Sequence, residues 1–196
     1  MITHVLLDMG GVLVELQWRE RMERLLNRPL PMAELHHLWV TASSTTDFES
    51  GRTDFDQFAA AFQQEFGLST ETATIQHEFL ELVQAPLPHC QQVLTDLKAR
   101  FHLSLLSNTN PAHHKKLSHQ YDFFHHFDQL FLSYQMGCMK PSSQIFERVI
   151  SHLKVPADTI AFFDDGARNV EAAQALGIRA FRVDSPDQVW DIAQKF

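Results

Sequence analysis

Short, continuous runs of hydrophobic residues recur along the chain, once at its start and then regularly after residue 88. Such runs predict strands that are buried on both faces, and they occupy residues 4–7, 101–106, 130–132, 159–163 and 178–183. Between the last four runs, apolar residues recur at helical spacing and predict helices. Strands that alternate with helices in this way are typical of a parallel, doubly wound sheet, so the sequence predicts an α/β fold.

The segment from residue 16 to residue 85 has a different pattern, in which apolar residues recur at helical spacing only. One stripe runs from Trp18 to Leu26, a second follows Thr53, which is a suitable N-cap, and a third extends from about Thr70 to Val83. No convincing strand interrupts these stripes. The sequence therefore predicts an all-helical block here.

These two patterns divide the chain into two predicted domains. Residues 1–15 and 86–196 are expected to form an α/β core with a Rossmann-like sheet, and residues 16–85 an inserted helical cap. The length of 196 residues suits one core domain with a smaller insert. Ligands of such sheets bind beyond the carboxyl ends of the strands, so the polar residues that follow the strands are the candidates for function.

The composition is that of an ordinary globular protein with an acidic charge balance. Hydrophobic residues make up 44% of the chain and charged residues 20%. The 16 Lys and Arg against 24 Asp and Glu give a net charge of -8, so the chain lacks the basic surplus that binds nucleic acid or an anionic membrane. A phosphorylated small molecule remains compatible if the site supplies cations locally.

The cysteines and the first residues bear on where the protein acts. The two cysteines, Cys90 and Cys138, cannot build a disulfide framework or a Cys-x-x-Cys metal site. The apolar run after Met1 is too short for a signal peptide, and no run approaches the roughly 20 residues of a membrane-spanning helix. We therefore expect a cytoplasmic protein, and we expect it to be a monomer or a weak homodimer.

Four short polar motifs follow predicted strands or open predicted helices. They are Leu7-Asp8-Met9-Gly10-Gly11, Leu106-Ser107-Asn108, Met139-Lys140-Pro141 and Phe163-Asp164-Asp165. Each motif alone is more often a turn or a helix cap than a functional site. Together, in this order and with a helical insert after the first, they resemble the haloacid dehalogenase-like (HAD) superfamily. The resemblance covers nearly the whole chain and points to the phosphatase-like branch with a helical cap, which includes bacterial sugar-phosphate phosphatases.

The resemblance implies a nucleophile and a metal site. Asp8 would attack phosphorus and form an aspartyl-phosphate, which splits the hydrolysis into two steps. Mg²⁺ prefers hard oxygen ligands, and it would be held by an Asp8 oxygen, the main-chain carbonyl of Gly10 and the carboxylate of Asp165. Asp164 would stand behind these ligands or reach the metal through a water molecule.

The resemblance also implies groups that bind the substrate phosphate. Lys140 would take part in catalysis by neutralising the nucleophile and the phosphoryl oxygens as a point charge. Ser107 and the Asn108 amide would donate hydrogen bonds to the phosphoryl oxygens. The implied function is that of a Mg²⁺-dependent phosphatase acting on a small phosphorylated metabolite, with a sugar phosphate as one candidate. The helical cap would close over this substrate.

The first motif departs from the family pattern at Gly10, two residues after Asp8. Most family phosphatases have a second Asp where this chain has Gly10, and that Asp protonates the leaving oxygen and later deprotonates water. Acid–base help of this kind is typically worth roughly 10²–10⁴-fold in rate. Three alternatives remain open: substrates with better leaving groups, a stand-in group such as Glu15, His36, His37 or Glu49, or the loss of catalysis with retention of binding.

Smaller departures and two other functions complete the interpretation. Gly166 stands where many relatives have Ser, and Asn169 stands where a further Asp is common and is expected to hold the loop. The adjacent histidines, such as His113 and His114, lack metal-ligand spacing and are expected to be solvated.

Hydrolytic dehalogenation, which needs no metal, is an alternative function, although the retained pair Asp164-Asp165 argues against it. A non-catalytic phosphate-binding relative is the other alternative.

Overall fold

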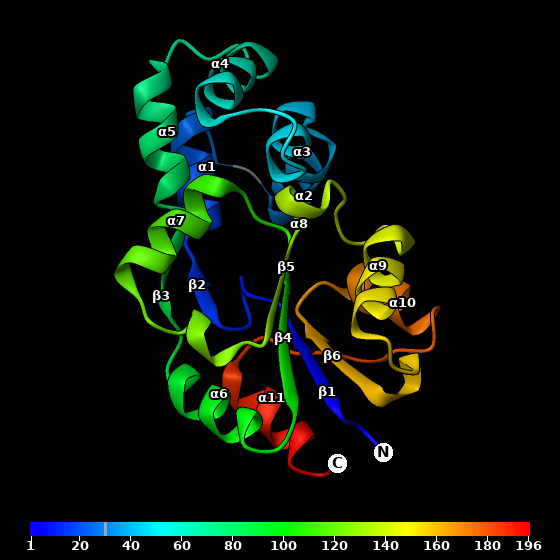
Figure 1. Ribbon diagram of the computed structural model, residues 1–196. Helices are drawn as coiled ribbons and strands as arrows, with labels where there is room; N and C mark the ends of the chain where they lie inside the picture. The colour runs from blue at the N-terminus through cyan, green and yellow to red at the C-terminus, as the bar shows by residue number, and fades with distance from the viewer. Residues whose placement is uncertain (30) are drawn as a thin grey trace.

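The protein is built around one five-stranded parallel sheet, in a computed structural model that describes residues 1–29 and 31–196 (Figure 1). The strand order is β5-β4-β1-β6-β7, and every neighbouring pair is parallel. The strands are β1 (His4–Leu7), β4 (His102–Ser107), β5 (Gln129–Leu132), β6 (Ile160–Asp164) and β7 (Arg179–Arg182). The chain adds β4 and β5 on one side of β1 and then β6 and β7 on the other. The predicted α/β class with a doubly wound parallel sheet is therefore confirmed.

Helices cover both faces of this sheet (Figure 1). One face packs against α6 (Cys90–Lys98), α7 (Pro111–Gln120) and α11 (Pro186–Ala193), and the other against α9 (Ser143–Leu153) and α10 (Ala167–Gln174). In β1, Val5 and Leu7 belong to the first apolar cluster and Leu6 to the second. This two-sided burial explains why the strand is a continuous apolar run, because successive side chains point to opposite faces.

Short elements join the larger ones. They are α8 (Ser133–Met136) and the 3₁₀ turns Phe124–His126 and Ala157–Thr159. No helix in the described ranges is both long enough and apolar enough to cross a bilayer.

The helices between β2 and β3 form a separate layer above the sheet (Figure 1). They are α1 (Trp18–Leu26), α2 (Met32–Thr41), α3 (Ser43–Glu49), α4 (Phe55–Glu65) and α5 (Thr72–Leu80). We call this layer the helical insert. It has its own apolar cluster, rich in stacked and tilted aromatic rings, whose fully buried members include Phe48, Phe58, Phe62 and Phe79. Each such ring contributes about 1.5–3 kcal/mol through burial, so the insert is stabilised by its own core.

Two strands at the root of the insert contradict the expectation of a strand-free segment. β2 (Val14–Leu16) pairs antiparallel with β3 (Val83–Pro86), with Val14 opposite Pro86 and Leu16 opposite Val83. The predicted helix through Val83 instead ends at Leu80. Sequence patterns do not reveal these strands, because three or four residues are too few for a visible alternation and their pairing depends on a distant segment. The predicted domain boundaries after residues 15 and 85 fall within these strands.

The start of α4 also differs from its prediction by one residue. Asp54, not Thr53, is the N-cap: its carboxylate accepts from the main-chain N–H of Gln57, and the Gln57 side chain accepts from the main-chain N–H of Asp54. This reciprocal pair is a capping box, which satisfies two free donors of the first turn. Thr53 cannot form a capping box, because the residue three positions later must be Glu or Gln and is Asp56.

Candidate active site

Three carboxylates meet where β1 and β6 end side by side. Asp8 follows β1, Asp164 is the last residue of β6, and Leu7 pairs with Phe163 in parallel register, so both carboxylates leave the same edge of the sheet. Asp165 comes next in the chain. One oxygen from each of Asp8, Asp164 and Asp165 lies within 4.8 Å of the others. This spacing could hold a divalent cation between hard oxygen donors.

Lys140 reaches this group from the loop between α8 and α9. Its Nζ lies 2.8 Å from Oδ1 of Asp8 and 2.6 Å from Oδ2 of Asp164, and the residue is buried. Oδ1 of Asp8 also accepts the main-chain N–H of Met9 at 2.7 Å. Because Oδ1 has two donors and the described residues supply none to Oδ2, Oδ2 is the oxygen of Asp8 that is left for a ligand or a substrate.

Asp164 is fully used within the protein. Besides the Lys140 contact at Oδ2, its Oδ1 accepts the main-chain N–H of Gly166 and the Asn169 side-chain amide, each at 2.8 Å. Asn169 thus holds the loop as expected of it. Asp164 fixes Lys140 rather than facing outward, which leaves Asp8 and Asp165 as the carboxylates with oxygens available to a metal.

The electrostatics of the group favour a bound cation. Burial raises the pKa of Asp8 well above its usual range, and Asp164 and Asp165 raise it further against the opposing effect of Lys140. Burial and then Asp164 raise the pKa of Asp165. Burial lowers the pKa of Lys140, but Asp164 and Asp8 outweigh burial and raise it overall, so Lys140 stays charged. Three carboxylates against one ammonium leave an excess of negative charge that a divalent cation would offset.

The carboxylate of Asp165 lies so close to the loop after β1 that position 11 must be a glycine. The φ of Gly11, +76°, lies in the left-handed region, and a Cβ at this position would be 2.6 Å from Oδ2 of Asp165. Only glycine adopts this conformation without a penalty and leaves this space free. The second glycine of the first motif therefore allows the carboxylate of Asp165 to come close to the loop after β1.

Replacing Gly11 with Ala is expected to destabilise the protein by about 1–3 kcal/mol, because strain and the contact with Asp165 add. Urea denaturation measures this loss, and isothermal titration with MgCl₂ should show weaker binding because Asp165 is displaced. Gly67→Ala is the matched control, since Gly67 has a φ of +61° and a Cβ added there would meet no atom within 4 Å. Equal losses and unchanged metal binding in both variants would contradict this role of Gly11.

Ser107 is the last residue of β4, the other neighbour of β1, and Asn108 follows it. Ser107 is buried, and among the described residues its hydroxyl has only a long contact of 3.4 Å, with the main-chain oxygen of Asn108. The Asn108 side chain donates to the main-chain oxygen of Lys140 at 2.9 Å and accepts the Lys140 main-chain N–H at 2.8 Å. The side chain of Asn108 thus positions the lysine loop. Donation from Asn108 to a phosphoryl oxygen would come from its main-chain N–H or from the second hydrogen of its amide.

A cavity of about 1020 Å³ lies between the carboxylates and the helical insert. Its floor includes Asp8, Ser107, Asn108, Lys140 and Asp165. Its walls include residues of the insert and of β2, namely Leu16, Trp18, Trp39, Thr45 and Glu49. His37 is exposed and is not among the lining residues, and the side chain of His36 lies outside the described residues.

His113 lies in this cavity wall, contrary to the expectation that it is solvated. It is buried on α7, where its Nε2 donates to the main-chain oxygen of Phe79 at 2.6 Å and its Nδ1 accepts from the Asn110 side chain at 3.0 Å. Burial lowers its pKa to about 4, so the ring is neutral at physiological pH. The sequence does not reveal that His113 is buried, because the residue that its Nε2 contacts, Phe79, belongs to the helical insert.

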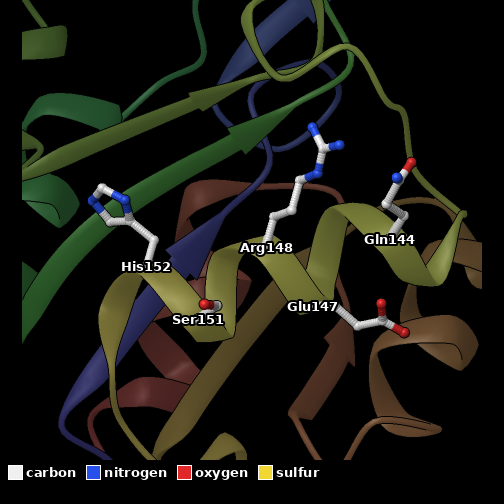
Figure 2. Close-up of a pocket in the computed structure, with 5 residues that line it drawn as sticks. All are labelled: Gln144, Glu147, Arg148, Ser151 and His152. Carbon is white, nitrogen blue, oxygen red and sulfur yellow. The ribbon is translucent and has the colours of Figure 1, made fainter.

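A second, shallower pocket lies on the outer side of α9 (Figure 2). It is lined by Gln144, Glu147, Arg148, Ser151 and His152, which all come from this one helix. It shares no residue with the carboxylate site and contains no strand end, so it brings together no candidate chemistry.

Comparisons with known proteins agree with this geometry. The sequence profile described as haloacid dehalogenase-like hydrolase matches residues 2–177. The chain is 26% identical over 191 residues to D-ribitol-5-phosphate phosphatase of Bacteroides thetaiotaomicron, and the match covers 93% of this chain and 92% of that protein.

Two solved structures have the same fold over most of their length. A HAD-like family hydrolase of Porphyromonas gingivalis has a TM-score of 0.80 and 26% identity, over 100% of this chain and 97% of the other. A HAD family enzyme of Bacteroides thetaiotaomicron, in complex with magnesium and inorganic phosphate, has a TM-score of 0.76 and 25% identity, over 93% and 94% of the two chains.

Proposed function

Because the chain belongs to the haloacid dehalogenase-like hydrolase family, we propose that this hydrolase is a magnesium-dependent phosphatase for a small phosphorylated metabolite. The observation that carries the proposal is the buried carboxylate of Asp8 beside Lys140 and the carboxylate of Asp165. The name of one relative, D-ribitol-5-phosphate phosphatase, and a neighbour's complex with magnesium and phosphate support it. A sugar or sugar-alcohol phosphate is the substrate class that we propose.

Asp8 is the proposed nucleophile. Its carboxylate attacks phosphorus, the bond to the leaving oxygen breaks, and water then hydrolyses the aspartyl-phosphate. Lys140, held by Asp164 and by the Asn108 side chain, supplies a fixed positive charge beside the attacking group and the phosphoryl oxygens. Ser107 donates to a phosphoryl oxygen from the end of β4.

Mg²⁺ would be held by Asp8, Asp165 and the main-chain carbonyl of Gly10, and the residues present fit it. When bound, it would neutralise charge on the carboxylates and on the phosphate. Asp165 fits this role because Gly11, which has no Cβ, lets its carboxylate lie close to the loop after β1. Asp8 fits because Lys140 and the main-chain N–H of Met9 contact only its Oδ1.

The same charge balance disfavours the dehalogenase alternative. The floor of the cavity places two carboxylates, Asp8 and Asp165, beside Lys140, and the buried carboxylate of Asp164 lies behind them on the other side of the lysine ammonium. Without a cation these groups would repel the carboxylate of a haloacid substrate, whereas a phosphatase that binds Mg²⁺ uses two of them as ligands. The carboxylate group therefore favours phosphate ester hydrolysis.

Removal of the metal tests this proposal directly. Release of inorganic phosphate from a panel of sugar and sugar-alcohol phosphates with MgCl₂ should show at least one substrate, and EDTA should lower that rate by about 100-fold or more. Readdition of MgCl₂ should restore it, while EDTA already saturated with Mg²⁺ serves as the control. Hydrolysis that persists in EDTA, or halide release from a haloacid without phosphate release from any ester, would refute the proposal.

A further inference from the structure

Gly10 leaves the place beside the nucleophile without an acid. A Cβ built on Gly10 would lie 3.0 Å from Cδ1 of Leu16, so the space next to the loop is occupied by an apolar side chain. A phosphate ester with an alcohol leaving group nevertheless needs a proton on the leaving oxygen, because an alkoxide is a poor leaving group. That proton has to come from another group in the cavity.

The ionisable residues that line the cavity, within the described ranges, narrow the choice. They are Asp8, Glu15, Arg19, Glu49, His113, Lys140, Asp165, Arg168 and Asp184. Arginine keeps its proton at all relevant pH values, and His113 uses both ring nitrogens inside the protein. Glu15 and Asp184 are exposed to solvent. Asp8, Lys140 and Asp165 already have roles in the proposed reaction, which leaves Glu49.

Glu49 is the last residue of α3 and has the surroundings of a proton donor. The residue is 6% exposed, and no hydrogen-bond donor in the described part of the chain contacts its carboxyl group. Burial raises its pKa to about 7, against the opposing charge of Lys140. A carboxyl group of this pKa can both give and take a proton near neutral pH.

The main chain of Glu49 is fixed to the catalytic edge of the sheet. Oγ of Ser133, which is fully buried, donates to the main-chain oxygen of Glu49 at 2.6 Å and accepts the main-chain N–H of Thr109 at 2.9 Å. Thr109 follows Asn108 in the loop after β4. One hydroxyl therefore ties the end of α3 to the loop that would bind the phosphate.

The same face of α3 has a second polar group without a partner. Thr45 lies four residues before Glu49, one helical turn away, and also lines the cavity. Its hydroxyl is buried and has no hydrogen-bond partner among the described residues. A buried hydroxyl without a protein partner is costly, which indicates that a polar ligand group binds on this side of the cavity.

We propose that Glu49 is the acid and base of the reaction and replaces the second Asp that this chain lacks. The inference rests on the proposed phosphatase function. In the first step the Asp8–phosphorus bond forms, the bond from phosphorus to the leaving oxygen breaks, and the Glu49 carboxyl proton passes to that oxygen. In the second step Glu49 takes a proton from water, whose oxygen bonds to phosphorus while the Asp8–phosphorus bond breaks. Glu49 is then protonated again and inorganic phosphate is released.

Glu49→Gln tests this assignment across two classes of leaving group. For an alkyl phosphate such as a sugar-alcohol phosphate, kcat/KM should fall by roughly 10²–10⁴-fold, because the alkoxide needs the proton. For p-nitrophenyl phosphate, whose leaving group needs none, kcat/KM should change less than about threefold. The ratio kcat/KM is chosen because it reports the steps up to release of the alcohol and not the later attack of water.

The outcomes separate this inference from the proposed function. An equal fall for both substrates, or no fall for the alkyl phosphate, would overturn the role of Glu49 while the phosphatase function stands. A wild-type protein that hydrolyses neither substrate with Mg²⁺ would overturn the function itself. Glu15→Gln removes a carboxyl group from the exposed rim of the same cavity and should leave both rates unchanged, and a leaving-group effect there in place of Glu49 would assign the role to Glu15 instead.

Discussion

Asp8→Asn is expected to lower kcat/KM by about 10⁴-fold or more, which is the scale of effect seen when a covalent nucleophile is removed. An amide oxygen keeps the shape of the side chain but carries no negative charge and cannot form the acyl phosphate. Phosphate release from the active substrate of the panel, measured with saturating MgCl₂, checks this result.

The fold of this variant can be followed independently of its activity. Urea denaturation should still show one cooperative transition, because Asp164 continues to hold Lys140 when Asp8 loses its charge. Wild-type enzyme mixed with a radiolabelled phosphate substrate and quenched in acid should retain label on the protein, and the variant should not. Activity in Asp8→Asn within tenfold of the wild type would refute Asp8 as the nucleophile.

Lys140→Met is expected to reduce the free energy of unfolding by about 3 kcal/mol and to remove activity, because Asp164 is then left as a buried charge without its partner. Asp164 has no exposed surface, and Lys140 lies 2.6 Å from its Oδ2. Methionine keeps most of the apolar length of lysine, so the decrease in the free energy of unfolding measures the effect of removing the charge. Urea denaturation in EDTA measures it without help from a metal ion.

An exposed ion pair provides the control for this variant. Lys98 pairs with Asp128, but the side chains of the two residues are 37% and 39% exposed. Solvent screens such a pair, so Lys98→Met should cost less than about 1 kcal/mol. Equal losses in the two variants would show that Lys140 contributes no more than a surface charge does.

The sequence alone predicts the sheet and the position of the carboxylates because both follow from local patterns. Continuous apolar runs end at Asp8 and Asp164, and parallel strands bring their carboxyl ends together. The strand pair of β2 and β3 could not be predicted in this way, since its hydrogen bonds join residues that are far apart in the chain.

Three properties of the site depend on contacts that a linear pattern does not contain. The Asn108 side chain binds the main chain of Lys140, His113 is buried by Phe79, and Glu49 is buried where α3 meets the core. In each case the residue that makes the contact lies more than thirty positions away in the chain. Residue type identifies such side chains as candidates, and only the folded arrangement of the insert over the sheet distinguishes Glu49 from the exposed Glu15.

The central position of β1 has a consequence for the order in which the protein is made. The strand that ends at Asp8 is synthesised first, but its partners arrive much later, since His4 pairs with His102 and with Ile160. Contacts of such long sequence separation slow folding. The helices of the helical insert are contiguous in the chain, so the insert can assemble on the ribosome before β4 and β6, the partner strands of β1, have been synthesised. A nascent chain that stops before β6 therefore carries the residues of the helical insert but lacks Asp164 and Asp165. The proposed metal site is complete only after β6 has been made.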